Sequence, residues 1–307
     1  MLVNATSLRA LFTGLSLLFH NALKGVATDY LDTAMVVPST GKGMDYAWLS
    51  RFPKMRKWIG DKFIKALALG KYYVANEDWE ATIEVLRNDI EDDQLGIYNA
   101  QAMMAGESAG ELFGDIVTNL KNNAFTATGM DGKTFYATDH ILVSSDGVAV
   151  TYSNKGTAVL SAATLSAVVA SYGAARAAIM GFKDEEGQPL GLVPDLLEVP
   201  PALEAVANII ANAEKLADDS PNPYRGTCRV KVNPRLTSST AWMLHVTNKA
   251  SLKPFVIQDR KSAVFVSQTS MENDDVFGRG AFRFGAEARA AGAYGFWQLS
   301  YGSTGAG

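Results

Sequence analysis

The chain has 307 residues, of which 48% are hydrophobic and 20% charged, a composition typical of a folded protein with a substantial buried core. Its formal net charge of −4 argues against broad electrostatic binding to nucleic acid, because such binding requires clustered lysine and arginine. The single cysteine, Cys228, excludes an intrachain disulfide bond and favours a reducing, cytoplasmic origin. Cys228 begins an alternating, strand-like run, so we interpret it as a structural residue.

The first predicted element is an amphipathic helix near the N-terminus. Its apolar residues recur at helical spacing on one face: Leu8, Leu11, Phe12, Leu15, Leu18, Phe19 and Leu23. Ser7 is placed to cap the first turn. The apolar run is too short to span a bilayer, and its polar face is not rich in lysine or arginine. We therefore expect the apolar face to pack on the body of the protein or on another copy, rather than on a membrane.

A long two-stranded excursion is predicted next. One strand-like run lies around residues 58–69 and a second around residues 72–86, with Gly70 near the turn between them. The stretch is locally basic because of the following residues: Lys54, Arg56, Lys57, Lys62, Lys65 and Lys71.

Four carboxylates then fall within five consecutive positions: Asp89, Glu91, Asp92 and Asp93. They precede a long helix predicted over residues 92–123. An EF-hand loop starting at Asp89 would need glycine at its sixth and glutamate at its twelfth position, and the chain has neither. The cluster is better explained as a helix start, with Asp92 or Asp93 as the cap and Lys121 complementing the dipole at the far end.

The remaining elements mix helices and strands. A helix capped by Thr164 is predicted over residues 164–182, and another follows a short strand, with Pro201 in its first turn. We expect the inward face of the first of these helices to consist of Leu165, Val168, Val169, Tyr172 and Ile179. Strands are predicted at CRVKVNPRL, AWMLHVT, PFVIQD and AVFVSQ. The closing stretch AFRFGAEARAAGAYGFWQLSYG indicates two long strands around a turn at Ala291 and Gly292.

Patterns that carry catalysis are weak in this sequence. The three histidines are far apart, and none belongs to an HExxH or HxH pattern. His140 has Asp139 beside it and can in principle pair with Ser144 or Ser145, but no GxSxG elbow accompanies it. We therefore expect no catalytic residue, no cofactor and no metal site. A metal-dependent hydrolase that uses the acidic cluster with His140 is the less favoured alternative.

Long segments of the chain resemble the major head proteins (gpT) of Mu-like phages. The similar segments lie in the same order along the chain: MLVNATSLRALFTGLSLLFHNAL, VPSTGKGMDYAWLSRFPKMRKWIGD, WEATIEVLRNDIEDDQLGIY, DGKTFYATDH, LVPDLLEVPPALEAVANIIANAE, KPFVIQDRK and VFGRGAFRFGAEARAAGAYGFWQLSYGS. Together they cover nearly the whole chain, and the resemblance is weakest over residues 141–163.

The resemblance implies an α+β fold of the Hong Kong 97 type found in tailed-phage capsids. In that fold an N-terminal arm and an extended loop precede a peripheral domain with a long spine helix and an axial domain. The implied regions are 1–50 for the arm, 51–88 for the extended loop, 89–184 for the peripheral domain with its spine helix, 185–262 for the axial domain, and 263–307 for strands returning to the peripheral domain.

The resemblance also implies a structural role and no enzymatic one. The chain would be a major capsid subunit whose hexamers and pentamers form an icosahedral head around double-stranded DNA, held without sequence-specific binding. About 50 residues precede the loop, too few for a scaffolding segment, so we expect a separate scaffold protein. Further expected partners are a portal, a head maturation protease and, as an option, a decoration protein. No membrane is involved, and assembly in the bacterial cytoplasm would lead to the virion. A tail-tube protein is the alternative structural part.

The same resemblance places the acidic cluster at the junction of extended loop and spine helix. We hypothesise that the cluster faces basic loop residues of a neighbouring subunit, and that the first helix also contacts neighbours. The candidate inter-subunit contacts are Leu11, Phe12, Leu15, Phe19, Arg56, Lys57, Lys62, Lys65, Asp89, Glu91, Asp92 and Asp93.

Overall fold

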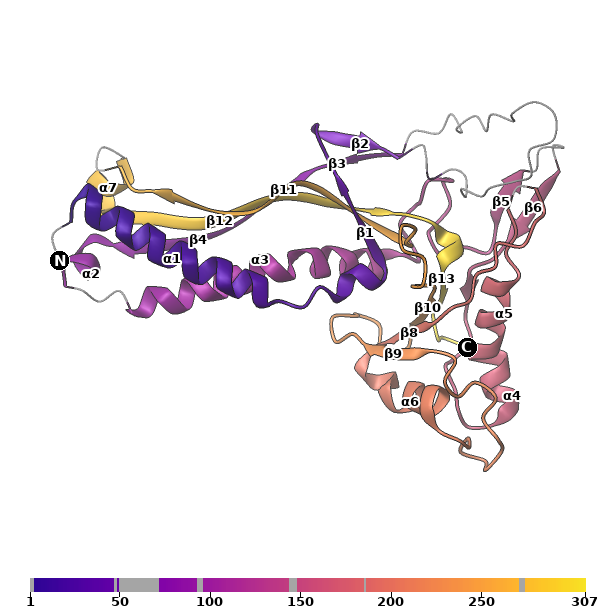
Figure 1. Ribbon diagram of the computed structural model, residues 1–307. Helices are drawn as coiled ribbons and strands as arrows, with labels where there is room; N and C mark the ends of the chain where they lie inside the picture. The colour runs from indigo at the N-terminus through magenta and orange to yellow at the C-terminus, as the bar shows by residue number, and fades with distance from the viewer. Residues whose placement is uncertain are drawn as a thin grey trace.

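The computed structural model describes residues 3–46, 49, 72–92, 96–143, 148–184, 186–270 and 274–307. They form an elongated body built on a long sheet, with a second sheet and its helices at one end (Figure 1). The N-terminus lies at the opposite end of the long body, and the C-terminus lies with the second sheet (Figure 1). Helices and sheets are combined as the predicted α+β class requires.

The long sheet has four strands in the order β1-β11-β12-β4. Their bounds are Ala34–Pro38 for β1, Phe255–Gln268 for β11, Ala281–Tyr294 for β12 and Glu77–Leu86 for β4. β11 and β12 are antiparallel partners, β4 pairs antiparallel with β12 along its whole length, and β1 runs parallel to the first part of β11. The predicted strands PFVIQD and AVFVSQ are therefore two parts of the single strand β11.

One face of the long sheet is apolar and the other is charged. Phe282 and Phe284 of β12 are buried in a cluster with residues of the covering helices. Alternate residues point to the opposite face, as the strand period of two requires. Cross-strand ion pairs lie on that face: Asp78–Arg289, Glu84–Arg283 and Lys261–Glu287. Among the residues that the structure describes, the long sheet thus packs on one side only, which is common for antiparallel sheets.

The helices on the packed face are α1, Ala5–Gly25, and α3, Gly96–Asn123. They lie side by side along the sheet (Figure 1). Two glycines of α3 allow this close approach. A Cβ atom at Gly106 would lie 2.3 Å from the carbonyl oxygen of Phe19, and one at Gly110 would lie 2.6 Å from Cγ2 of Val26.

A capping box fixes the start of α1. The Asn4 side chain accepts a hydrogen bond from the Ser7 amide at 2.9 Å, and Ser7 Oγ accepts one from the Asn4 amide at 3.0 Å. The prediction of Ser7 as the cap was therefore wrong. Asn4 is the cap, because its short amide side chain reaches the third amide of the helix, and Ser7 returns the bond from inside the first turn.

The second sheet has five strands in the order β7-β13-β10-β8-β9. Their bounds are Lys155–Gly156 for β7, Ser300–Ser303 for β13, Trp242–His245 for β10, Leu196–Val199 for β8 and Arg229–Val232 for β9. Its helical segments are α4 (Leu165–Val168), the π-helical η3 (Val169–Gly173), α5 (Ala174–Met180), η4 (Pro201–Leu203) and α6 (Glu204–Asn212). Every residue of β8 and β10 is buried, so these two strands form the centre of this part of the molecule.

The helix predicted over residues 164–182 is present as α4, η3 and α5 in succession. Thr164 caps it as predicted, because its hydroxyl accepts a hydrogen bond from the Ala167 amide at 3.1 Å. The buried residues of this helix include Val168, Tyr172 and Ile179, again as predicted. Leu165 and Val169 are 41% and 45% exposed, so their placement on the inward face was wrong. Val168, Tyr172 and Ile179 lie on the side of the helix that faces the core. Leu165 and Val169 lie outside that side.

The shorter elements complete the described chain. They are η1 (Asp29–Asp32), β2 (Gly43–Asp45), β3 (Tyr73–Ala75), α2 (Arg87–Glu91), β5 (His140–Val143), β6 (Ala149–Tyr152), α7 (Asp274–Arg279) and η5 (Trp297–Leu299). Among the helices within the described ranges, none is both long and apolar enough to cross a membrane.

The closing part of the chain differs from its prediction. Ala291 and Gly292, expected at a turn, lie inside β12 and pair with β11. Gly292 marks a close contact instead, because a Cβ atom there would lie 2.7 Å from Cγ2 of Ile116 on α3. β12 ends at Tyr294, and after η5 the chain enters the second sheet as β13.

Only part of the predicted two-stranded excursion is described. β2 pairs with β3, which brings the two ends of the segment 46–72 together. The first strand-like run, 58–69, lies outside the described residues. The second is present as β3 and β4, and β4 has β12 as its partner. Pairing between the two runs therefore stays a prediction.

The two sheets divide the chain differently from the predicted regions. β7, α4 and α5 come from the stretch predicted as peripheral, and they belong to or accompany the second sheet. β13 comes from the predicted return strands and is also part of the second sheet. The order of elements in a sequence does not show which of two sheets a short strand joins.

Candidate functional site

Asp89 and Glu91 of the acidic cluster lie on a short helix, Arg87–Glu91, at the end of the long body opposite the second sheet (Figure 1). This helix, α2, joins β4 to α3, and Ile90 fixes it by inserting into the core with only 1% exposure. Asp89 accepts a hydrogen bond from the Tyr98 hydroxyl. Glu91 forms an ion pair with Arg87 at 2.9 Å, one helical turn apart. Asp89 is therefore tied to the start of α3 and Glu91 to α2 itself, and both keep solvent-exposed surface.

The prediction that Asp92 caps the long helix was wrong, and the same prediction for Asp93 stays a prediction. Asp92 ends α2, where its amide donates to the Asn88 carbonyl at 2.8 Å, and α3 begins only at Gly96. Asp93 lies outside the described residues. In the part of the chain that is described, no group of three or more carboxylate, histidine or cysteine side chains is arranged to hold a metal ion.

The basic partners proposed for this cluster cannot be placed beside it. Arg56, Lys57, Lys62 and Lys65 all lie outside the described residues, so their contact with acidic residues stays a prediction. Glu91 and Asp92 are exposed, and Asp89 is half-buried. Their positions leave them accessible to a second molecule.

The apolar face of α1 is covered largely by its own chain. Leu15 and Phe19 are 1% and 0% exposed. Phe265 of β11 lies against α1, with ring centroids 5.2 Å from Phe19 and 5.7 Å from Phe12. Of the two alternatives left open, packing on the body is therefore realised for Leu15 and Phe19. Phe12 and Leu11 keep partial exposure and stay candidates for a contact with another copy.

A buried ion pair joins α3 to the second sheet. Lys121 of α3 and Glu198 of β8 are 1% and 0% exposed, and Nζ lies 2.7 Å and 3.0 Å from the two carboxylate oxygens. Asn233 donates to the same carboxylate at 2.8 Å, and His245 Nε2 lies 3.3 Å from it. Burial alone would raise the pKa of Glu198, but the Lys121 ammonium holds this pKa well below its usual range. Burial lowers the pKa of His245 and favours its neutral form.

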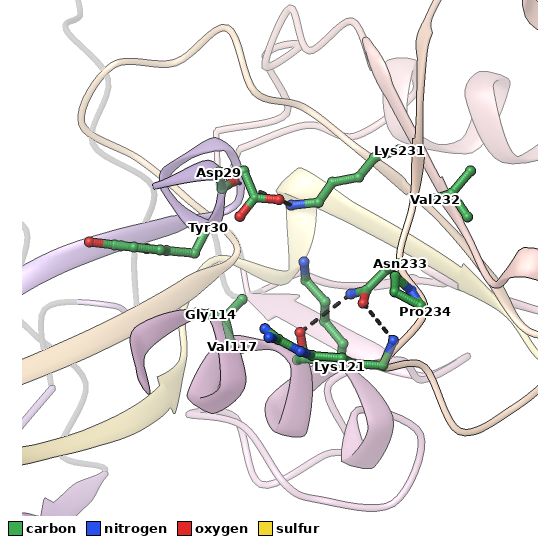
Figure 2. Close-up of a pocket in the computed structure, with 11 residues that line it drawn as sticks. Asp29, Tyr30, Gly114, Val117, Lys121, Lys231, Val232, Asn233 and Pro234 are labelled. Atoms are coloured by element: carbon green, nitrogen blue, oxygen red, sulfur yellow. Dashed lines mark hydrogen bonds and ion pairs between the residues drawn. The ribbon is translucent and has the colours of Figure 1, made fainter. Parts of the chain in front are cut away.

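Exposed ion pairs surround this buried one. Asp29 of η1 meets Lys231 of β9 at 2.6 Å, and Arg235 reaches Glu111 and Asp115 of α3 at 2.8 Å and 2.9 Å. Figure 2 shows Asp29 and Lys231 pointing toward each other on the far side of the cavity from α3. The cavity between them has a volume of about 180 Å³. The junction of the two sheets is thus polar and hollowed.

This junction was not found from the sequence. Lys121 was interpreted as a cation at a helix end, which is its usual place on a surface. Its partner Glu198 lies 77 residues away, inside an apolar strand. A glutamate flanked by leucine and valine in a short buried strand is the one available signal, because buried carboxylates are rarely left unpaired.

His140, the histidine considered for catalysis, is a structural residue. It is 1% exposed, and its ring stacks on Trp297 with centroids 4.2 Å apart. Nδ1 lies 2.5 Å from Asp131 Oδ2, and Nε2 lies 3.0 Å from Asn154 Oδ1. Both ring nitrogens are therefore engaged, and neither is presented to a substrate as a general base would be.

The hydrolase alternative fails on geometry as well. Asp139, the predicted neighbour, pairs with Lys133 instead of His140. Ser144 and Ser145 lie outside the described residues. His140 lies beside the second sheet, whereas the acidic cluster lies at the opposite end of the long body (Figure 1). The two groups that this alternative requires do not meet within one chain.

Comparison with known proteins gives a match along most of the chain. The family Mu-like prophage major head subunit gpT matches residues 8–164, 156–236 and 233–306. The chain is 26% identical over 293 residues to the Mu-like prophage FluMu major head subunit of Haemophilus influenzae, covering 95% of this chain and 71% of that protein. It is 26% identical over 300 residues to the major capsid protein of Escherichia phage Mu, covering 98% of this chain and 74% of that protein.

Comparison of the fold with solved structures also finds a phage capsid protein. A chain from the procapsid of bacteriophage JBD30 is similar with a TM-score of 0.63 and 27% sequence identity, covering 98% of this chain and 76% of that chain. The similarity therefore includes the long sheet, α3 and the second sheet together, and it identifies the Hong Kong 97-type capsid fold. The chain belongs to the family of Mu-like prophage major head subunits (gpT), the major capsid proteins of tailed phages of this kind.

Proposed function

We propose that copies of this chain form hexamers and pentamers that close into an icosahedral head around double-stranded DNA. The observation that carries the proposal is the match to the major head subunit family from residue 8 to residue 306, joined to the procapsid likeness over 98% of the chain. The net charge of −4 suits a shell that encloses DNA without gripping its phosphates. The role is structural, and no catalytic step is assigned to any residue.

Each part of the molecule has a proposed place in the shell. The long sheet with α1 and α3 is the peripheral domain, and α3 is its spine helix. The second sheet with α4–α6 is the axial domain at the centre of each ring, and the extended loop comes from the part of the predicted range 51–88 that precedes β4. The elongated outline, with the long sheet alongside α3 and the second sheet at the C-terminal end of this helix, supports this assignment (Figure 1).

The acidic helix α2 is the proposed docking point for the extended loop of a neighbouring copy. Residues 51–71 contain seven basic side chains and one acidic side chain, so their charge is opposite to that of α2. Each exposed pair contributes only about 0–1 kcal/mol, but the same pairs recur around a closed shell. Replacing both Asp92 and Asp93 by lysine should lower the yield of shells, and adding Lys57→Glu and Lys62→Glu should restore part of it. An unchanged yield in the first variant would contradict this docking.

The proposed partners follow from assembly. Copies of the same chain are the main ones. A separate scaffold protein, a portal and a head maturation protease act during assembly in the bacterial cytoplasm, and a decoration protein is a further candidate on the finished head. Leu11 and Phe12 of α1 are the proposed points at which the arm touches a neighbour, since both keep exposed surface.

Electron microscopy of the purified chain, with and without its scaffold partner, tests this function. Closed shells, or rings of six and five subunits, are the expected result. Uniform small particles under both conditions would contradict a capsid role. Helical tubes would indicate a tail-tube protein instead.

A further inference from the structure

Three polar side chains meet where α3 joins the second sheet, and all three are shielded from solvent. Lys121, Glu198 and Asn233 are 1%, 0% and 7% exposed. Glu198 Oε1 accepts hydrogen bonds from Lys121 Nζ at 3.0 Å and from Asn233 Nδ2 at 2.8 Å. The amine and the amide therefore share one carboxylate oxygen, and no more than two hydrogen-bond lengths separate their nitrogens. A nucleophile, a proton carrier and an amide are thus gathered in one buried site.

Burial brings the Lys121 amine closer to its neutral, nucleophilic form. A lysine attacks only after its ammonium group loses a proton, and burial lowers the pKa of Lys121. The Phe255 ring lies 5.7 Å from Nζ and replaces water on that side. Glu198 Oε2 lies 2.7 Å from Nζ, within reach of the proton that Lys121 must release. Proton transfer within this ion pair yields the free amine beside the amide.

The Asn233 amide is held as an acceptor for that amine. Its carbonyl oxygen Oδ1 accepts a hydrogen bond from the Arg235 backbone amide at 3.0 Å. A donor in this position stabilises the negative charge that develops on an amide oxygen when a nucleophile adds to its carbon. Nδ2 faces Glu198, which can pass a proton to the departing nitrogen. Lys121 and Asn233 both line the cavity of about 180 Å³, which has room for released ammonia (Figure 2).

We propose that Lys121 and Asn233 of the same chain become joined by an isopeptide bond, with Glu198 carrying protons between them. Lys121 Nζ forms a bond to Cγ of Asn233, and the bond from Cγ to Nδ2 breaks. Both protons that the Nζ ammonium gives up pass through Glu198 to Nδ2, which leaves as an ammonium ion, so no further reactant is needed. The bond forms once in each chain, so the structural role gains no enzymatic turnover, and assembly is not required.

Such a bond fastens α3 to the second sheet. Asn233 directly follows β9, so the link closes a covalent loop over residues 121–233. The ion pair between Lys121 and Glu198 is then the state of the chain before the bond forms. A covalent loop persists after unfolding and restricts the unfolded chain, which stabilises the folded subunit.

Intact-mass spectrometry of the denatured, unmodified chain tests this bond. We expect a mass lower by one ammonia than the sequence requires. Digestion with trypsin should give a branched peptide that contains both Lys121 and Asn233, because trypsin does not cleave after a lysine in amide linkage. A folded chain that keeps its full mass after prolonged incubation would overturn the proposal, and so would loss of ammonia without the branched peptide.

Two variants and a matched control assign the roles of the three residues. Glu198→Gln keeps both reacting groups but removes the proton carrier, so bond formation should become about 100-fold slower or more. Lys121→Arg keeps a cation opposite Glu198 but has no amine, so it should keep its full mass. Lys231→Arg changes a second lysine that lines the same cavity, and it should lose ammonia as the unmodified chain does.

Circular dichroism shows which variants are folded. Bond formation at the unmodified rate in folded Glu198→Gln, or loss of ammonia in folded Lys121→Arg, would contradict the assignment. If neither variant folds, the mass and the branched peptide of the unmodified chain decide. Because these measurements use the free chain, they are independent of the proposed function: a linked chain that forms no shells would contradict assembly alone, and shells of unlinked chains would contradict the bond alone.

Discussion

Helix α3 makes two contacts of opposite character along its length. At Gly106 and Gly110 it meets α1 through backbone and aliphatic groups, in a contact so close that there is no room for a Cβ atom. Near its end it meets the second sheet through Lys121 and Glu198, beside a cavity of about 180 Å³ and a set of exposed ion pairs. The first contact depends on shape and the second on charge.

The difference separates a rigid part of the subunit from an adjustable one. A close-packed contact has one arrangement, because any displacement creates voids or overlaps. A buried ionic contact is instead sensitive to pH and to the loss of either partner, because the remaining charge is then left without compensation. The long sheet with its two helices should therefore behave as one body, and the position of the second sheet should respond to its charges.

The largest effect is expected from breaking the charged contact on one side. Glu198→Ala leaves the Lys121 ammonium buried without a partner, which should lower the free energy of unfolding by about 3–5 kcal/mol. The double variant Lys121→Met with Glu198→Leu removes both charges and should cost much less. Urea unfolding of the free subunit, followed by circular dichroism, measures both. Equal losses would show that the pair is not buried as a unit.

The close-packed contact between α1 and α3 should be destabilised by any added side-chain atom that overlaps the facing helix. Gly106→Ala places a methyl group against the Phe19 backbone and should cost about 1–3 kcal/mol of unfolding free energy. Gly14→Ala on α1 is the matched control, because a Cβ atom there meets nothing within 4 Å. It should stabilise the helix by about 0.5–1 kcal/mol. Thermal unfolding measures the stability of both variants. An unchanged stability of Gly106→Ala would mean that α1 moves freely on α3.

Acid should weaken the charged contact and leave the other unaffected. Burial lowers the pKa of His245, so the unfolded chain takes up a proton below about pH 6.5 that the folded chain refuses. The lowered pKa of Glu198 adds a further loss below about pH 4.5, where the unfolded carboxylate is protonated first. The free energy of unfolding should therefore fall as the pH decreases from 7 to 4. His245→Gln should flatten the fall between pH 7 and 5.5, and an unchanged slope would contradict this origin.

The smallest effect is expected at the exposed rim of the junction. Arg235→Ala removes ion pairs to Glu111 and Asp115, and its cost should be about 0–1 kcal/mol and decrease with added salt. Lys215→Ala, which removes the exposed pair with Asp219 elsewhere, is the control. A loss at Arg235 that is larger and independent of salt would place it in the buried network instead.

Local sequence patterns predicted many of the helices and strands. Helical spacing predicted α1 and α3, Thr164 predicted the start of α4, and alternation predicted most strands of both sheets. These features depend on neighbours along the chain, so a sequence displays them directly. The collinear resemblance supplied the capsid fold, which no local pattern contains.

Features that depend on distant residues were missed. Gly292 resembles a turn residue until α3 is placed over it, and Lys121 resembles a surface cation until Glu198 lies opposite. Leu165 and Val169 fit the apolar pattern of a buried helix face, yet both are exposed in the single chain. If a second copy covers them in the shell, the pattern was correct for the assembly rather than for the subunit.

Cryo-electron microscopy of the chain co-expressed with its scaffold partner would test its assembly into a head. We expect closed icosahedral particles in which each subunit shows the long sheet with α1 and α3 packed as one body, and the second sheet meeting its copies at the centre of each ring. Particles that remain single subunits, or that grow as open tubes, would contradict it.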